Sequence, residues 1–179
     1  MLHKLFKQNS EPQQYATILY QAIVATARQP QFYREYQVPD TPLGRYEMLS
    51  LVTSLVLYRL KYPIGADKSY DLDEISQEIV DSLIVDLDAC IREITKEDLK
   101  VGQRIKKMAQ GFYGRLISLN DALSSDDKAA VTAMLKRNAY GFSEDIDQIA
   151  ADLAGQVLSM HKKLATRPLK AILKEKSLI

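Results

Sequence analysis

PLGRYEMLSLVTSLVLYRLK, residues 42–61, contains the longest uncharged apolar run in the sequence, from Met48 to Tyr58. A helix over this stretch carries apolar residues on nearly every face, at Leu49, Leu51, Val52, Leu55, Val56, Leu57 and Leu60. Asp40 or Thr41 can cap its start, and Pro42 suits the first helical position. Because a helix that is apolar all round is normally buried, we expect this one at the centre of the domain.

Helical periodicity continues on both sides of this stretch, and no Asn-Gly or Asp-Gly hairpin signal is present. Further helices are expected over residues 12–28, 70–94, 97–122, 124–138 and 143–166, with one short helical turn at 32–36. The predicted fold class is therefore all-α, a single-domain bundle of about six helices with the nearly fully apolar helix at its centre. The expected segments are a mobile N-terminus at 1–11, a helical domain at 12–168 and a basic C-terminal tail at 169–179.

Two apolar stripes predict which helix faces are buried. In the first helix the expected stripe is Tyr15, Ile18, Ala22 and Ala25. In the helix expected over 97–122 it is Val101, Ile105, Met108, Phe112, Leu116 and Leu119. Gly111 and Gly114 interrupt this second helix at a cost of about 1 kcal/mol each relative to alanine. Either close helix packing, the favoured reason, or access for a partner would offset that cost.

Composition excludes several classes of protein. The chain has 179 residues and a net charge of +1, so its overall charge gives no argument for binding DNA. One cysteine, Cys90, excludes an internal disulfide framework, and with His3 and His161 it is too little for a typical zinc site. The 11-residue run from Met48 to Tyr58 is shorter than the roughly 20 residues that span a membrane. The N-terminus lacks the features of a secretory signal.

The charges are unevenly distributed along the chain. Residues 66–98 hold 11 acidic residues against three basic ones, whereas residues 99–115 hold five basic residues and no acidic one. Lys100, Arg104 and Lys107 are spaced by four and three, so they share one helix face. This face could meet ribosomal RNA, anionic lipid or an acidic protein segment, or it could be a solvated face paired with the acidic helix. Arg45 could pair with a carboxylate or point into a groove for a partner.

Catalytic patterns are weak in this sequence. The Asp-x-Asp pairs place their carboxylates on different sides of a helix, and we find neither a Glu-x-x-His motif nor a nucleophile elbow. We therefore expect no enzyme activity, no metal and no cofactor. An all-α metal or isoprenoid enzyme would have only the acidic helix from Asp71 to Asp88 as support.

Two stretches of the sequence resemble the ubiquinol–cytochrome c chaperone family. The first is Arg28-Gln-Pro-Gln-Phe-Tyr33 with Val38-Pro-Asp-Thr-Pro-Leu-Gly-Arg-Tyr-Glu-Met-Leu49. The second is Asp98-Leu-Lys-Val-Gly-Gln-Arg-Ile-Lys-Lys-Met-Ala-Gln-Gly-Phe-Tyr-Gly-Arg115. With a later segment, Ala122–Ala130, the resemblance covers about residues 15–170. Val52 stands where the family often has a histidine, and Thr95 and Glu97 stand where it often has glycines.

The resemblance implies an assembly chaperone that binds newly made cytochrome b and supports its maturation into respiratory complex III. In mitochondria such proteins act near the ribosomal tunnel exit with a small partner protein. The compact form resembles alphaproteobacterial members, which implies the bacterial cytoplasm at the inner membrane, or the matrix side in a mitochondrion. The alternative is a general helical protein that binds RNA or an anionic membrane surface.

Within the two matching stretches, two sets of residues are expected to bind partners. A chaperone for apolar helices needs an apolar or aromatic groove, and the expected client-binding residues are Tyr33, Tyr36, Asp40, Arg45, Tyr46, Phe112 and Tyr113. The expected basic surface, which would hold the protein against the ribosome or anionic headgroups, comprises Lys100, Arg104, Lys106, Lys107 and Arg115.

Overall fold

The computed structural model describes residues 10–63, 69–94, 98–141, 145–174 and 178, with the side chains of residues 98–100 left out of that description. The helices are α1 Glu11–Ala27, α2 Pro30–Arg34, α3 Pro42–Lys61, α4 Leu72–Ile94, α5 Asp98–Ser124, α6 Lys128–Asn138, α7 Asp147–Thr166 and α8 Leu169–Lys174. Within these described residues every regular element is a helix, which confirms the predicted all-α class.

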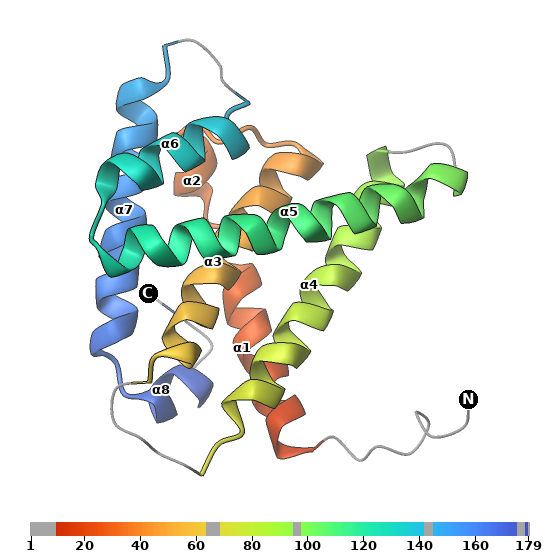
Figure 1. Ribbon diagram of the computed structural model, residues 1–179, viewed down its shortest axis with the longest axis vertical. Helices are drawn as coiled ribbons and strands as arrows, with labels where there is room; N and C mark the ends of the chain where they lie inside the picture. The colour runs from red at the N-terminus through yellow and green to blue at the C-terminus, as the bar shows by residue number, and fades with distance from the viewer. Residues whose placement is uncertain (1–9, 64–68, 95–97, 142–144, 175–177, 179) are drawn as a thin grey trace.

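Helix α3 is the centre of the bundle, as its sequence predicts. It packs against α1, α4, α5 and α7, and α5 crosses in front of it in Figure 1. Residues 48–57 are all buried. Two hydroxyl groups inside this stretch find hydrogen-bond acceptors within the helix itself. The Thr53 hydroxyl donates to the Leu49 carbonyl (2.7 Å) and the Ser54 hydroxyl to the Ser50 carbonyl (2.8 Å). Thr53 and Ser54 can therefore be buried, whereas the buried Ser50 hydroxyl has no hydrogen-bond partner among the described residues.

The start of α3 is fixed by a cap and a close backbone contact. The Thr41 hydroxyl oxygen accepts a hydrogen bond from the Gly44 backbone N–H at 3.1 Å, and Pro42 occupies the first turn. A Cβ atom at Gly44 would lie 1.9 Å from the Pro39 carbonyl oxygen. The Thr41 backbone N–H donates to that same oxygen at 2.8 Å, which holds it in place. Only glycine fits at position 44.

Several helix boundaries and one buried face differ from the sequence prediction. Helix α5 continues to Ser124, and α6 begins later because Asp127 accepts a hydrogen bond from the Ala130 backbone N–H at 3.0 Å. Helix α7 begins at Asp147, while Ser143 lies outside the described residues. In α1 the expected stripe is rotated, because α1 packs against α3, α4 and α8 at once. Ala25 is exposed and the buried residues are Ala16, Leu19, Ala22, Ile23, Thr26 and Ala27.

The segment expected as a basic tail forms an amphipathic helix that packs onto the domain. Helix α8 contacts α1 and buries Leu169, Ile172 and Leu173, while Lys170 and Lys174 remain exposed. Beyond it, Leu178 is buried and its carbonyl accepts a hydrogen bond from Arg167 at 2.7 Å. Leu169, Ile172 and Leu173 share one face of the helix, and this face is buried. The basic side chains of Lys170 and Lys174 therefore lie on the solvent-facing side of α8.

Across the described stretches, none of the helices combines the length and the apolar character that a membrane crossing requires.

Candidate functional site

The predicted client-binding aromatic residues do not gather on one surface. Tyr46 and Phe112 are core residues, with 2% and 0% of their surface exposed. Tyr33 and Tyr36 are half-buried at α2, whereas Tyr113 projects from α5 and is 49% exposed. Aromatic residues in one stretch of sequence point in different directions around a helix, so only Tyr113 of this set presents a large apolar face to solvent.

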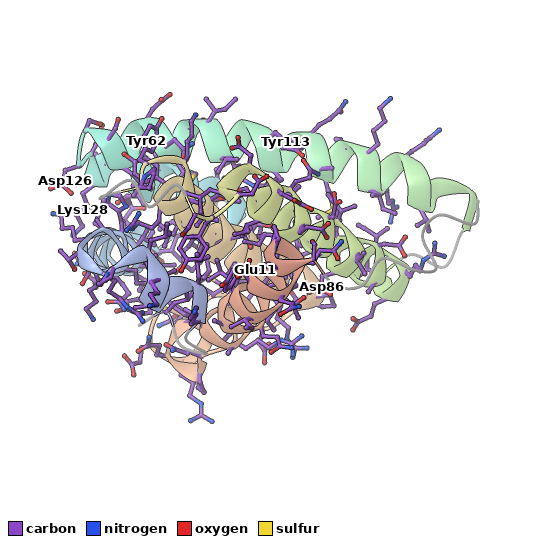
Figure 2. All side chains as sticks on the ribbon, turned by 90° about the horizontal axis from the view of Figure 1, so that it is seen from below. Glu11, Tyr62, Asp86, Tyr113, Asp126 and Lys128 are labelled. Carbon is purple, nitrogen blue, oxygen red and sulfur yellow. The ribbon has the colours of Figure 1, made fainter. Side chains whose placement is uncertain are left out.

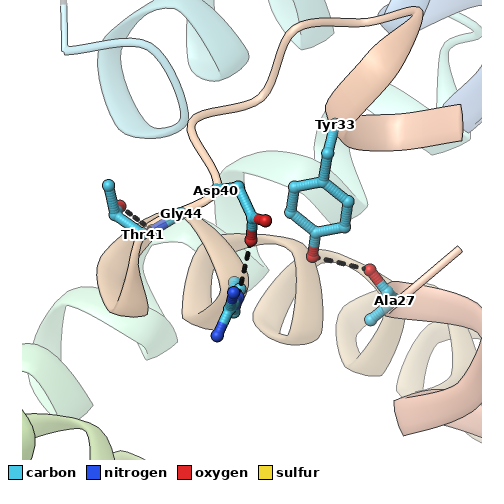
Figure 3. A network of polar contacts seen from close by, with 6 residues as sticks. Ala27, Tyr33, Asp40, Thr41 and Gly44 are labelled. Atoms are coloured by element: carbon cyan, nitrogen blue, oxygen red, sulfur yellow. Dashed lines mark hydrogen bonds and ion pairs between the residues drawn. The ribbon is translucent and has the colours of Figure 1, made fainter. Parts of the chain in front are cut away.

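The residues around α2 form a polar junction between α1 and α3 (Figure 3). The Tyr33 hydroxyl donates to the Ala27 carbonyl at 2.9 Å, and Arg45 Nε donates to Asp40 Oδ1 at 2.6 Å. The Tyr140 hydroxyl donates to the Tyr36 carbonyl at 2.6 Å, which joins this junction to the residues after α6. Arg45 lowers the pKa of Asp40 through this contact. Arg45 therefore pairs with a carboxylate, one of its two expected roles.

Arg45 also borders a hollow of about 210 Å³ between α1, α3 and α4. Cys90 lies in its wall, and burial raises the pKa of that thiol. Charges of both signs surround the hollow, from Arg28 and Arg45 on one side and Asp86 and Glu93 on the other. This mixture gives no clear preference for an anion or a cation.

Arg115, expected on the basic surface, instead forms a half-buried ion pair with Glu47 of α3. The Arg115 Nε atom lies 3.5 Å from Glu47 Oε2, and the two side chains are only 22% and 16% exposed. Burial raises the pKa of Glu47, and the positive charge of Arg115 partly offsets that rise. The pair fastens α5 to the central helix.

Gly111 and Gly114 of α5 do not serve close helix packing, so that interpretation is wrong. A Cβ atom at Gly111 would meet only the Arg115 guanidinium, at 3.2 Å, and one at Gly114 would meet nothing within 4 Å. Gly111 thus gives room to the ion-paired arginine. Nothing in the structure explains Gly114.

Three of the remaining basic residues are exposed, on different sides of α5. Arg104, Lys106 and Lys107 are all exposed along the first half of α5. Lys100 precedes them by one turn, and its side chain lies outside the described residues. Helix α4 packs against α5 and carries exposed acidic side chains, such as Asp73 and Asp81. Charges of opposite sign therefore face solvent on two adjacent helices.

An open groove of about 970 Å³ lies between α3, α4 and α5. In Figure 1 the end of α4 and the start of α5 lie near each other and the two helices diverge from there, with the last turns of α3 between them. The groove has an apolar lining from all three helices, contributed by Leu57, Leu60, Leu72, Val80, Tyr113 and Leu116. Its polar lining comprises Lys61, Ser69, Tyr70, Asp71, Asp73, Ser76 and Gln77, with Pro63 beside them.

Large apolar side chains remain exposed next to this groove. Tyr113 is 49% exposed, Ile117 one turn further along α5 is 63% exposed, and Tyr62 at the end of α3 is 51% exposed. Tyr62 and Tyr113 both lie on the side of the molecule along which α5 runs (Figure 2). Because Tyr113 both lines a concave surface and exposes half of its side chain, this region is the best candidate for binding an apolar partner.

Sequence reasoning identified Tyr113 but missed the rest of this groove. Its lining combines residues from positions 57 to 116, which only the tertiary fold brings together. One signal was available. Tyr113 and Ile117 are large apolar residues one turn apart, and they lie off the stripe of α5 that ends in Leu116 and Leu119.

Another side chain with catalytic potential, His161, packs against an aromatic ring. The His161 ring packs edge-on against Tyr58, with ring centres 4.9 Å apart, and burial lowers the pKa of His161. In the described part of the chain, no three His, Cys, Asp or Glu side chains gather where they could hold a metal ion.

Comparison with known proteins connects this chain to one family. The family model described as ubiquinol-cytochrome C chaperone matches residues 34–178. Among solved structures, the crystal structure of the Cbp3 homolog from Brucella abortus shares 38% sequence identity and a TM-score of 0.80, with 100% of this chain and 97% of that chain covered. No curated protein sequence matches significantly.

Proposed function

Because the chain belongs to the ubiquinol–cytochrome c chaperone family, we propose that it binds newly made cytochrome b and supports its maturation into respiratory complex III. The likeness to a family member over the whole chain is the observation that carries this proposal. The proposal gives the chain a binding role and assigns it no catalytic step. It places the protein in the bacterial cytoplasm at the inner membrane, or on the matrix side in a mitochondrion.

The groove gives this proposal a physical basis. Cytochrome b presents long apolar helices before it is assembled, and these helices need cover from water until they find their partners. The groove between α3, α4 and α5 combines an apolar lining with the exposed side chains of Tyr113 and Ile117. An amphipathic or apolar helix can lie in such a groove and bury apolar area on both sides.

A deletion experiment tests the proposed role. The gene is deleted in the host, and membranes are examined for b-type haem by difference spectroscopy and for complex III by native gel electrophoresis. We expect both to fall sharply, other respiratory complexes to remain, and wild-type protein supplied in trans to restore them. Normal complex III in the deletion strain would contradict the proposal.

A second candidate function is binding to ribosomal RNA or an anionic membrane surface without a specific client. The exposure of Arg104, Lys106 and Lys107 on α5 favours it. Such binding depends on release of counterions or on attraction to anionic headgroups, and it falls steeply with salt. If purified protein bound ribosomes or anionic vesicles at low salt, lost them at physiological salt and bound no cytochrome b, this second function would replace the first.

A further inference from the structure

We infer that the groove between α3, α4 and α5 receives the positively charged end of an apolar helix, namely the aqueous boundary of a membrane-spanning client segment. The inference rests on the proposed function and deepens it, because it names the part of the client that is held.

The shape fits a helix. Two diverging helices form the walls, α4 and α5, and the last turns of α3 form the floor (Figure 1). Leu57 and Leu60, one turn apart on α3, both line this floor. A helix that lies between two others packs its side chains into the grooves between theirs, and the open side of the groove leaves its outer face to solvent or to lipid.

The exposed side chains show what the occupant must offer. Tyr113 lines the α5 wall and Ile117 follows it by one turn of α5; they are 49% and 63% exposed. Covering them is favourable only for a partner that brings its own apolar surface. A tyrosine at the rim also suits the junction between an apolar segment and water, because its ring is apolar and its hydroxyl is polar.

The charge of the groove selects which end of an apolar helix can enter. Asp71 and Asp73 lie at the start of α4 and line the groove, and Lys61 is the one cation among its described lining residues. Asp71 also accepts a hydrogen bond from the Glu74 backbone N–H at 3.0 Å, so its carboxylate is fixed in position. Lysine or arginine near the end of an entering helix would approach these carboxylates, whereas acidic residues would be repelled.

The apex of the V that α4 and α5 form carries charges of both signs. Lys106 and Lys107 lie toward it on α5, about two helical turns before Tyr113, and Asp88 and Glu93 lie toward it on α4. A positively charged helix end is therefore attracted mainly to the open end, where Asp71 and Asp73 line the groove. Membrane-spanning helices carry their excess of Lys and Arg on the cytoplasmic side, which is the side where the proposed function places this protein.

Binding of designed peptides tests the inference directly. Three fluorescent helical peptides share one leucine–alanine core and end in three lysines, three glutamines or three glutamates. Their affinities for the full chain are measured by fluorescence anisotropy at low and physiological salt. We expect the lysine-ended peptide to bind most tightly and the glutamate-ended peptide most weakly. Equal affinities, or the reverse order, would overturn the inference.

Variants locate the binding. Tyr113→Ser with Ile117→Ser removes exposed apolar surface without touching the buried floor, and should abolish binding of all three peptides. Asp71→Asn with Asp73→Asn keeps a hydrogen-bond acceptor at the start of α4, and should weaken the lysine-ended peptide alone by roughly three- to tenfold.

The matched control is Asp145→Asn with Asp152→Asn, which makes the same change of charge at exposed positions around the start of α7. Asparagine tolerates the positive φ of 63° at Asp145 and can accept the hydrogen bond that Gln148 donates to Asp152. This control should bind every peptide as the wild type does. If it weakened the lysine-ended peptide as much as the groove variant does, the effect would be one of overall charge and the inference would fail.

Two further readouts separate this inference from the proposed function. If the wild type and the Tyr113→Ser, Ile117→Ser variant captured cytochrome b equally in cells, the groove would not be the client-binding site, while the proposed function would stand. If the wild type captured none, the proposed function would fail, and the peptide series would still decide the groove. Light scattering gives the mass of the free protein. If the wild type were a dimer and the Tyr113→Ser, Ile117→Ser variant a monomer, the groove would be an interface between two copies of the chain, and the inference would be overturned.

Discussion

At the scale of single residues, the ion pair between Glu47 and Arg115 links the central helix to α5 in a place that water reaches poorly. Replacing Arg115 with methionine would leave the Glu47 carboxylate half-buried without its counter-charge. We expect the free energy of unfolding at pH 7 to fall by roughly 2 kcal/mol, less than the cost for a fully buried pair because both side chains keep some contact with water. Urea denaturation measures this loss.

The pH dependence of that loss identifies its cause. Burial already raises the pKa of Glu47 in the folded state above its ordinary value, so the folded protein binds this proton more tightly than the unfolded chain does. Stability tied to Glu47 is therefore greatest at acid pH and is lost as the pH rises through the raised pKa. Removing Arg115 enlarges that loss at pH 7. The deficit of Arg115→Met should shrink at pH 4 and when Glu47→Gln is added, and an equal deficit under all three conditions would contradict this explanation.

Gly44 gives a second test at this scale. Alanine at position 44 would place its Cβ 1.9 Å from the Pro39 carbonyl oxygen, so the start of α3 would have to move. We expect Gly44→Ala to lower the free energy of unfolding by roughly 2 kcal/mol or more. The matched control is Gly114→Ala in α5, where nothing lies within 4 Å and alanine should add up to about 1 kcal/mol. Equal stability of the two variants would show that the close contact is not needed.

Predictions from sequence at this scale succeed where the cause is local. The cap by Thr41 and the place of Pro42 follow from neighbours within four residues, and both are observed. The pairing of Arg115 with Glu47 joins positions far apart in the sequence, so a charge pattern along α5 alone suggested a surface residue. Residue type also says little about exposure in a helix, since Phe112 is buried while the adjacent Tyr113 is exposed.

At the scale of elements, a buried arginine joins the central helix to the end of α7. Arg59 Nε donates to the Leu164 carbonyl and Nη2 to the Arg167 carbonyl, each at 3.0 Å. The last carbonyl groups of a helix lack the next turn as a partner, and Arg59 donates to two of them; the Leu164 carbonyl also accepts from the Arg167 backbone N–H, at 3.4 Å. Arg59 acts as a cap supplied by another helix.

Substitution of Arg59 tests this role. Arg59→Met keeps much of the volume but removes both hydrogen bonds, and we expect a loss of roughly 1–3 kcal/mol in the free energy of unfolding. Hydrogen exchange should show the largest loss of protection at the end of α7 and in α8. Arg59→Lys retains one donor group and should fall between the wild type and Arg59→Met. Unchanged exchange at the end of α7 in Arg59→Met would contradict the capping role.

The long helices could be predicted from the sequence because their apolar periodicity is strong. The ranges expected for α3 and α4 agree with the structure within two residues, and α3 is central because no face of it is polar enough to meet water. The start of α6 and the packing of α8 were missed for different reasons. For α6, both Ser124 and Asp127 are residue types that cap helices, and the predicted range began at the first of them, whereas Asp127 is the N-cap. For α8, six residues are too few to show a helical period.

At the scale of the whole molecule, the separation of charge matters more than the net charge of +1. Exposed cations lie on the first half of α5, and acidic residues border the groove at the start of α4. Reversing Lys106→Glu and Lys107→Glu should reduce association with anionic vesicles severalfold at low salt, with little change in the free energy of unfolding. Vesicle flotation measures the association. Unchanged flotation would remove the basic surface from the account.

Binding of cytochrome b is measured most directly by affinity capture of the tagged protein from its own host after mild crosslinking, with captured proteins identified by mass spectrometry. We expect enrichment of cytochrome b over other abundant membrane proteins, with crosslinks near Tyr113 and Ile117. Capture of ribosomes or lipid without cytochrome b, or of membrane proteins in proportion to their abundance, would contradict this expectation.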